Sequence, residues 1–374
     1  MYRLFDESKK ELIKASTKEY KKFDKEKLYH EESQKDNILL QDKEKEILQV
    51  FNNFDIKINI DKKINGFQTM LFTIIPINKE ELKKLLRNKK LLEYYLKTEI
   101  KKEENNFLIE YEKDKKDILY LYDVIENKNN NYININIGKD TQNNIVNMNI
   151  EKLPHLLVGG TTGSGKSVFI NSIITSLIYN YSNKDIKLFL VDAKRTELKQ
   201  FENIPHLQYE IAHDIQEVNL LLDFLIKTMY DRYKILESNN CKNIQEYNKI
   251  HKHNKWSYYI CIIDELADLM LQDKKNIELK ICKLVQLSRA SGIHLIVATQ
   301  RPSTDIVTGL IKSNFSSRLC FKVASVYDSR TILDKKGGEL LQGNGEAIYK
   351  NANNIDYVKL QTPYISSEEL QKIL

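Results

Sequence analysis

The sequence of 374 residues predicts an α/β fold with a mainly parallel sheet, preceded by a small α+β subdomain and a charged N-terminal arm. Three observations lead to this prediction. Composition changes near residues 45 and 130. Apolar runs alternate with helical stretches over residues 131–374, as βαβ units require. One apolar run, His155–Val158, leads directly into a glycine-rich loop, and a helical stretch over Val168–Tyr179 follows that loop.

The N-terminal part of the chain divides into two segments. Residues 1–45 are rich in Lys and Glu and have few apolar positions, which predicts a helical or disordered arm without a compact core. Residues 46–130 alternate between strand and helix patterns and form the predicted α+β subdomain. Its strand-like runs and its helical run are Phe54–Ile60, Gln68–Ile75, Asn106–Tyr111 and Lys79–Leu96.

The third segment, residues 131–374, contains five apolar runs of strand length. They are His155–Val158, Ile186–Val191, Tyr258–Ile263, His294–Ala298 and Arg318–Val323. Helical stretches separate most of these runs, and buried parallel strands read as continuous apolar sequence. We therefore expect a parallel sheet with both faces covered.

Composition says more about where the protein is located than about which molecules it binds. The net charge is only +6, because 58 basic residues nearly balance 52 acidic ones, so total charge does not decide for or against a nucleic-acid partner. The four cysteines form no C-x-x-C pair, which favours reduced thiols over disulfides or zinc. No apolar run approaches the ~20 residues that span a bilayer, and the first residues lack the apolar core of a signal peptide. The sequence thus predicts a cytoplasmic protein.

The glycine-rich loop matches the phosphate-binding pattern G-x-x-x-x-G-K-[ST] at every required position. Its residues are Gly160, Thr161, Thr162, Gly163, Ser164, Gly165, Lys166 and Ser167. In such a loop, backbone N–H groups surround the phosphates of ATP, and the following helix adds its positive end. Lys166 is expected to reach the β- and γ-phosphates, and the Ser167 hydroxyl to ligate Mg²⁺.

Two carboxylates follow the predicted strand Tyr258–Ile263. Asp264 is expected to hold Mg²⁺ and Glu265 to polarise the attacking water in nucleotide hydrolysis. The pair could also cap the helix predicted over Leu266–Leu271. The two roles are compatible, and the phosphate loop elsewhere in the chain favours catalysis.

Two further residues lie beside the next predicted strand, His294–Ala298. Gln300 follows the strand and could sense the γ-phosphate, an interpretation that we favour over a simple turn residue. Arg289 precedes the strand, and its sequence context leaves two readings open. It could stabilise the transition state at a neighbouring subunit's nucleotide, or it could be a helix-end arginine that interacts with the helix dipole.

These motifs resemble, in order, the motor domain of the FtsK/SpoIIIE DNA translocases, and the resemblance covers about residues 132–365. The matching blocks are Leu153–Ser167, Asp192–Leu198, Ile204–Leu207, Arg232–Lys234, Ile262–Met270, Ser288–Ser303, Thr308–Asn314 and Asp328–Asp334. The resemblance implies a RecA-like P-loop ATPase that forms a homo-oligomer, a hexameric ring around double-stranded DNA, and acts in chromosome segregation or DNA transfer. Residues 46–130 resemble the family's small subdomain only in pattern and position.

The resemblance also implies roles for single residues. Lys166 and Ser167 would bind ATP and Mg²⁺, Asp264 and Glu265 would serve hydrolysis, and Arg289 would be the finger that acts in trans. Loops in the pore of the ring would bring Arg301 and Lys312 to the DNA phosphates, a contact that carries no sequence information. For Lys312, a solvated helix lysine is an equally good reading.

We expect a motor that lacks the family's membrane-spanning segments and its winged-helix module, which leaves room for a membrane-anchored partner protein. The leading function is an ATP-driven double-stranded DNA translocase. The alternative, a coupling ATPase of a secretion or conjugation system, predicts tandem motor domains or membrane helices, and the sequence contains neither. A phosphate-loop kinase or GTPase would lack the paired carboxylates followed by a Gln-tipped strand.

Overall fold

The computed structural model of the chain describes residues 5–6, 11–12, 37–67, 69–103, 106–113, 117–126, 132–152, 154–351 and 357–374. Most of the predicted arm, residues 1–45, lies outside these ranges. The chain divides into a small compact unit, His30–Leu119 with Lys139–Ile145, and a large one that contains Tyr120–Gly138 and Val146–Leu374. The two units are described separately below.

The small unit is an antiparallel sheet with two helices. Its strands, in the order β3-β4-β6-β5, are β3 (Ile58–Asn65), β4 (Thr69–Pro76), β6 (Asn106–Glu112) and β5 (Ile100–Glu103). Helices α1 (Asn37–Asn53) and α2 (Lys79–Leu96) share one apolar core with the sheet, in which Phe51, Phe72 and Leu85 are fully buried. Helix α2 begins after Asn78, whose side chain accepts hydrogen bonds from two backbone N–H groups of the first turn.

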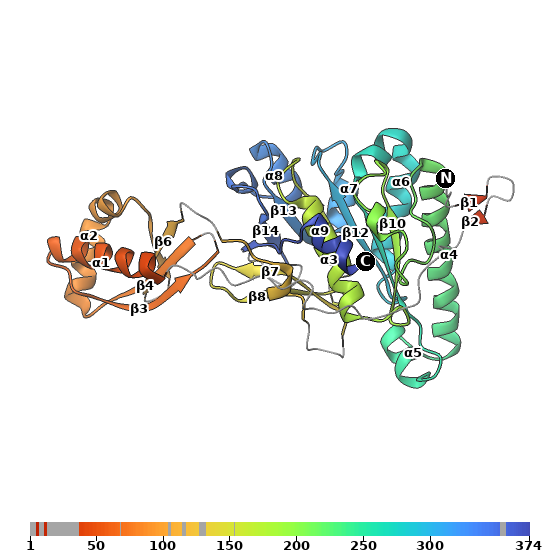
Figure 1. Cartoon of the computed structure of the whole chain (residues 1–374), viewed down its shortest axis with the longest axis horizontal. Helices are drawn as coiled ribbons and strands as arrows, with labels where there is room; N and C mark the ends of the chain where they lie inside the picture. Colours follow the sequence, from red (N-terminus) through yellow and green to blue (C-terminus); the bar gives the residue numbers. More distant parts are fainter. Residues whose placement is uncertain are drawn as a thin grey trace. The chain divides into compact units, whose positions relative to one another are not determined.

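The large unit is built on a nine-stranded sheet, in the order β10-β11-β12-β9-β13-β14-β15-β7-β8 (Figure 1). The strands are β7 (Asn134–Asp140), β8 (Ile145–Asn149), β9 (His155–Gly159), β10 (Ile186–Val191), β11 (Tyr258–Ile263), β12 (Ile293–Thr299), β13 (Ser317–Phe321), β14 (Glu346–Lys350) and β15 (Tyr357–Gln361). The five strands from β10 to β13 are parallel, as the sequence predicts. Beyond them, β13–β14 and β14–β15 pair antiparallel, so the sheet is mixed but mainly parallel, as predicted.

Helices cover this sheet (Figure 1). They are α3 (Lys166–Asn180), α4 (Ile215–Ser238), α5 (Ile244–Ile250), α6 (Leu266–Leu287), α7 (Gly309–Asn314), α8 (Val326–Leu333) and α9 (Ser367–Ile373). Short 3₁₀ turns occur at Leu121–Asp123, Lys199–Phe201 and Gly338–Leu340, and β1 (Phe5–Asp6) pairs with β2 (Glu11–Leu12). One large cluster of buried apolar residues joins α4 and α6 to strands β10, β11 and β12.

Two predictions about the whole chain can be compared with the described residues. No helix among them is long and apolar enough to span a membrane. All four cysteines fall within them, and each is free and buried. Burial raises the pKa of the Cys261 thiol to about 12, which keeps it protonated and unreactive at neutral pH.

Candidate active site

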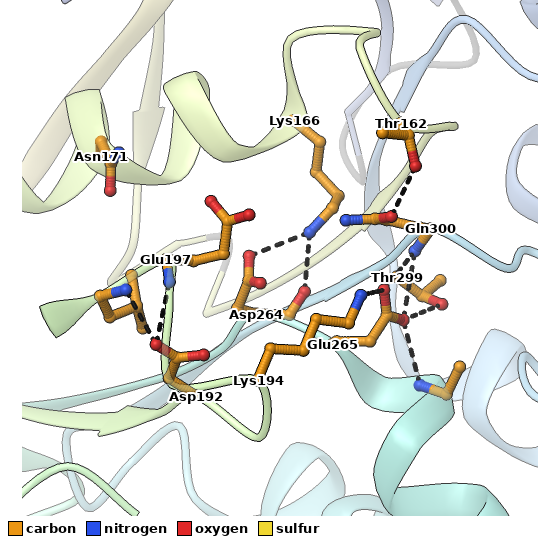
Figure 2. Close-up of polar contacts among 12 residues, drawn as sticks. Thr162, Lys166, Asn171, Asp192, Lys194, Glu197, Asp264, Glu265, Thr299 and Gln300 are labelled. Atoms are coloured by element: carbon orange, nitrogen blue, oxygen red, sulfur yellow. Dashed lines mark hydrogen bonds and ion pairs between the residues drawn. The ribbon is translucent and has the colours of Figure 1, made fainter. Parts of the chain in front are cut away.

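Four neighbouring parallel strands end at the same edge of the large sheet, and polar residues follow each of them directly. Most of these residues were predicted from the sequence. The phosphate loop, residues 160–165, follows β9, and Asp192 follows β10. Asp264 and Glu265 follow β11, and Gln300 follows β12. Ligands of open α/β sheets bind at the carboxyl ends of parallel strands. Figure 2 shows that side chains from these strand ends point toward one another.

The phosphate loop is held in shape by backbone contacts from behind. Gly163 and Gly165 have positive φ angles of 76° and 109°, which only glycine adopts without strain. The N–H of Gly345 donates to the Ser164 carbonyl at 2.9 Å. A Cβ atom on Gly165 would lie 2.5 Å from that same Gly345 nitrogen. The loop therefore depends on glycine both for its backbone conformation and for its close approach to the chain beneath it.

Helix α3 begins where the loop ends and presents free donors to the site. Gly165 is its N-cap and offers no side chain to the first N–H groups of the helix. Such groups, together with the positive end of the helix dipole, form an anion-binding site. The interior of α3 is apolar, with Ile170, Ile173 and Leu177 buried, so the helix is fixed against the protein core.

Lys166 is paired with Asp264 across the site. Its ammonium lies 2.9 Å from the Asp264 carboxylate oxygen Oδ1 and 2.8 Å from the Asp264 carbonyl oxygen (Figure 2). Both side chains are only 2% exposed. The second carboxylate oxygen, Asp264 Oδ2, is buried without a hydrogen-bond partner among the described residues. A buried carboxylate oxygen in this position fits the oxygen ligands that Mg²⁺ prefers.

Glu265 is held by several donors from neighbouring elements. Its Oε1 accepts hydrogen bonds from the Thr299 hydroxyl at 2.8 Å and from the Ala267 N–H at 3.2 Å. Its Oε2 accepts from the Gln300 N–H at 3.0 Å and lies 3.8 Å from the Lys194 ammonium. Glu265 is thus the N-cap of α6, so the capping role considered from the sequence is confirmed. Its carboxylate is also oriented by the end of β12.

Gln300 connects β12 to the phosphate loop. The Thr162 hydroxyl donates to the Gln300 side-chain oxygen at 2.8 Å (Figure 2). If the Gln300 side chain bonded to a bound phosphate in place of Thr162, nucleotide binding would change the contact between the phosphate loop and the end of β12. The structure therefore brings Lys166, Asp264, Glu265 and Gln300 into one site.

Arg289 does not join that site in its own chain. It lies in the turn between α6 and β12, at the opposite end of β12 from Gln300. Seven strand residues at ~3.3 Å each separate the two ends by about 20 Å. The Arg289 side chain is exposed, and its Nε donates to the Glu151 carbonyl at 3.1 Å. Any contact of Arg289 with a γ-phosphate requires a second copy of the chain.

The two candidate DNA contacts differ in their surroundings. Arg301 is exposed next to Gln300. The Lys312 ammonium lies 2.7 Å from Asp334 Oδ1, and Asp334 also pairs with Arg318 and Lys350. Burial opposes ionisation of Asp334, but the hydrogen bonds from Lys312 and Lys350 outweigh it and hold the pKa of this carboxyl well below its usual range. Lys312 therefore takes part in an ion-pair cluster within the chain.

Asp192 and Lys194 belong to the site but were not singled out from the sequence. Asp192 is 1% exposed, and its Oδ2 accepts hydrogen bonds from the Glu197 and Leu198 N–H groups, both at 3.0 Å. These bonds shape the loop that carries Lys194 to Glu265. The available signal was a carboxylate directly after the buried strand Ile186–Val191, the same signal that identifies Asp264.

Comparisons with known sequences point to one family. Residues 121–304 match the model of the FtsK/SpoIIIE family. The chain is 43% identical over 249 residues to a DNA translocase FtsK of Leptospira interrogans, covering 65% of this chain and 26% of that protein. It is 41% identical over 273 residues to DNA translocase FtsK of Campylobacter jejuni, and the match covers 71% of this chain and 29% of that protein. It is 41% identical over 264 residues to DNA translocase FtsK of Clostridium tetani, and the match covers 68% of this chain and 36% of that protein. The chain thus spans about a third or less of the length of these relatives.

Solved structures show the same fold. The monomer form of the pCW3 conjugation coupling protein TcpA with ATPγS is similar with a TM-score of 0.62 at 24% identity, over 89% of this chain and 98% of that one. The cytoplasmic domain of the type VII secretion ATPase EccC of Thermomonospora curvata has a TM-score of 0.56 at 22% identity. This match covers 65% of this chain and 30% of that one. These similarities confirm the predicted α/β fold of a P-loop ATPase.

Proposed function

This chain belongs to the FtsK/SpoIIIE family, and on that premise we propose that it is a motor that hydrolyses ATP to move along double-stranded DNA during DNA segregation or transfer. The observation that carries the proposal is the meeting of three groups at one edge of the sheet. These are the phosphate loop, the pair Asp264 and Glu265, and the Gln300-tipped strand. Phosphoryl transfer requires positioning and charge stabilisation, which this arrangement supplies.

In the proposed mechanism, the first N–H groups of α3 and the Lys166 ammonium bind the phosphates of ATP. Lys166 exchanges its two hydrogen bonds with Asp264 for bonds to phosphate oxygens. Ser167 and Asp264 would hold Mg²⁺, which supplies charge neutralisation when bound. Glu265, oriented by Thr299 and the Gln300 N–H, accepts a hydrogen bond from the attacking water and polarises it.

The position of Arg289 supports the part of the proposal in which identical subunits form a ring. At about 20 Å from its own Gln300, it reaches a nucleotide only across a subunit boundary. We therefore propose a homo-oligomer, a hexamer by likeness to the family, with residues 131–374 as its motor and the cytoplasm as its place of action. Arg301 and Lys312 would contact DNA phosphates in the pore, and Lys312 would have to leave Asp334 to do so.

The test is the rate of ATP hydrolysis with and without long duplex DNA, at low and at moderate salt. We expect strong stimulation by duplex DNA that fades as salt rises, because phosphate contacts release counterions. The Lys166→Ala variant serves as the control for contaminating ATPases. A rate that is indifferent to DNA would contradict the proposal and favour the alternative, a coupling ATPase that moves protein.

A further inference from the structure

A cavity of about 760 Å³ opens at the amino ends of β10 and β11, the edge of the sheet opposite to the active site. Lys184 and Asp185 directly precede β10, and Trp256 precedes β11 by two residues. Helix α5 and the segment after it, residues 251–256, form another wall. A volume of this size is typical of ligand sites. None of the roles assigned above uses this cavity.

The rim of the cavity carries more positive than negative charge. Four exposed lysines line it, and none of them forms an ion pair within the part of the chain that the structure describes: Lys184, Lys249, Lys252 and Lys255. Two carboxylates, Glu151 and Asp185, also line the cavity, so four lysines against two carboxylates leave a net charge of +2, and both carboxylates bond to uncharged groups. The Glu151 carboxylate accepts from the Gln245 amide at 2.9 Å, and Asp185 accepts from the Ser182 hydroxyl at 2.6 Å. Such a cluster attracts a ligand with several negative charges.

Hydrogen bonds and ring stacking hold the wall that carries these lysines in place. The backbone N–H and carbonyl of Trp256 both bond to the Asn248 side chain, at 2.8 and 3.0 Å. The Trp256 ring stacks on Tyr247 with 3.9 Å between ring centroids. The Ser257 hydroxyl donates to the Lys184 carbonyl at 2.8 Å, which ties the two lysine-bearing segments together. The charged rim is therefore positioned before any ligand arrives.

We propose that this cavity is a second nucleic-acid contact, in which the rim lysines bind backbone phosphates. Four lysines on two separate segments match a polymer with a phosphate at every nucleotide better than a single nucleotide. The aromatic lining, which includes the exposed Tyr132, offers surfaces on which unpaired bases can stack. The inference rests on the proposed function only in taking nucleic acid as the polyanion, and it requires no ATP hydrolysis.

Trp256 makes the proposal directly testable, because it is the only tryptophan in the chain. We would titrate the full chain with a short duplex oligonucleotide, a single-stranded oligonucleotide of the same length, and ATP, and follow tryptophan fluorescence. Either form of nucleic acid should change the signal saturably. With four phosphate contacts on duplex DNA, log affinity should fall with log salt with a slope of about −3 to −4.

Variants of the rim separate this site from other contacts with DNA. Lys252→Glu with Lys255→Glu should weaken the binding seen by Trp256 by about tenfold or more and flatten the salt slope. Lys252→Gln with Lys255→Gln is the milder version, should charge reversal disturb folding. The matched control is Lys83→Glu with Lys90→Glu on α2, which changes the same number of exposed lysines in the other unit and should leave the Trp256 response unchanged.

Three outcomes would overturn the proposal: no response to nucleic acid, a response to ATP alone, or a response that follows protein concentration alone, which would assign the surface to a second copy. Undiminished binding by both rim variants would do the same. If Trp256 responds to nucleic acid but duplex DNA does not stimulate hydrolysis, the proposed translocase function fails while this site stands.

Discussion

Lys166 and Asp264 form an ion pair that is almost entirely buried, with 2.9 Å between Nζ and Oδ1. The same ammonium also bonds to the Asp264 carbonyl, so it is held at two points. In this pair, the candidate phosphate-binding cation neutralises the candidate magnesium ligand. A bound triphosphate must replace Asp264 as the partner of Lys166, and Asp264 must then find another cation.

This pairing predicts that Lys166→Ala affects folding as well as activity. Removing the cation leaves a buried, unpaired carboxylate, which should lower the free energy of unfolding by about 3 kcal/mol. Nucleotide binding and turnover should be lost. Adding Asp264→Asn should restore most of the stability without restoring activity. Denaturant midpoints and binding of a fluorescent nucleotide provide the two readouts, and a single variant that is as stable and active as wild type would remove Lys166 from the site.

Glu265→Gln should separate nucleotide binding from hydrolysis. The amide keeps the size of the side chain and an oxygen that can accept hydrogen bonds from Thr299 and Ala267, so the cap of α6 should survive. It cannot act as a base, so turnover should fall by about 100-fold or more while ATP remains bound. Rapid filtration after incubation with labelled ATP measures both quantities. Normal turnover in this variant would exclude Glu265 from the chemistry.

The two glycines of the loop offer a matched pair of substitutions. Gly163→Ala has open space around the new Cβ and only a positive φ to tolerate, a strain of about 1–2 kcal/mol. Gly165→Ala adds a Cβ contact of 2.5 Å with the Gly345 backbone. We therefore expect nucleotide affinity to fall much further in Gly165→Ala than in Gly163→Ala. Equal losses in a nucleotide titration would show that the packing beneath the loop does not set its shape.

The parallel centre of the fold and the centre of the site could be predicted because burial leaves a direct trace in sequence. Strands β10 and β11 have the predicted bounds, since fully covered strands read as unbroken apolar runs. Strand β5, with the sequence Ile-Lys-Lys-Glu, escaped detection because three of its four residues are exposed and charged. Likewise, the bonds of Asp192 depend on how the loop to Leu198 folds back, which no local pattern encodes.

Three buried histidines predict a loss of stability in acid; one of them is His206, which is 1% exposed and whose pKa is lowered by burial to about 4. His155 and His294 are 3% and 1% exposed, and burial lowers the pKa of His294 to about 3 and that of His155 well below its usual value. All three rings are neutral in the folded protein, so their contribution is complete above the unfolded pKa of ~6.5 and is lost as pH falls toward the folded values. At pH 5, His206 and His294 should each cost about 2 kcal/mol.

Unfolding midpoints measured between pH 7 and pH 5 test this expectation. His294→Gln should remove about a third of the histidine-linked part of the pH dependence, since one of three comparable groups is gone. A His294→Gln protein with the full acid sensitivity of wild type would assign that sensitivity to other groups.

Arg289 provides the test of whether subunits share a site. It lies at the far end of β12 from Gln300, so Arg289→Ala should leave ATP binding intact and abolish hydrolysis only if the residue reaches a neighbour's nucleotide. Lys166→Ala should also be inactive, for a different reason. When the two inactive proteins are mixed, interfaces that combine an intact Lys166 with an intact Arg289 of the adjacent copy should regain activity. Hydrolysis that rises on mixing would establish action in trans. Its absence in mixtures shown to co-assemble would leave Arg289 as a residue that only binds the Glu151 carbonyl at the end of α6.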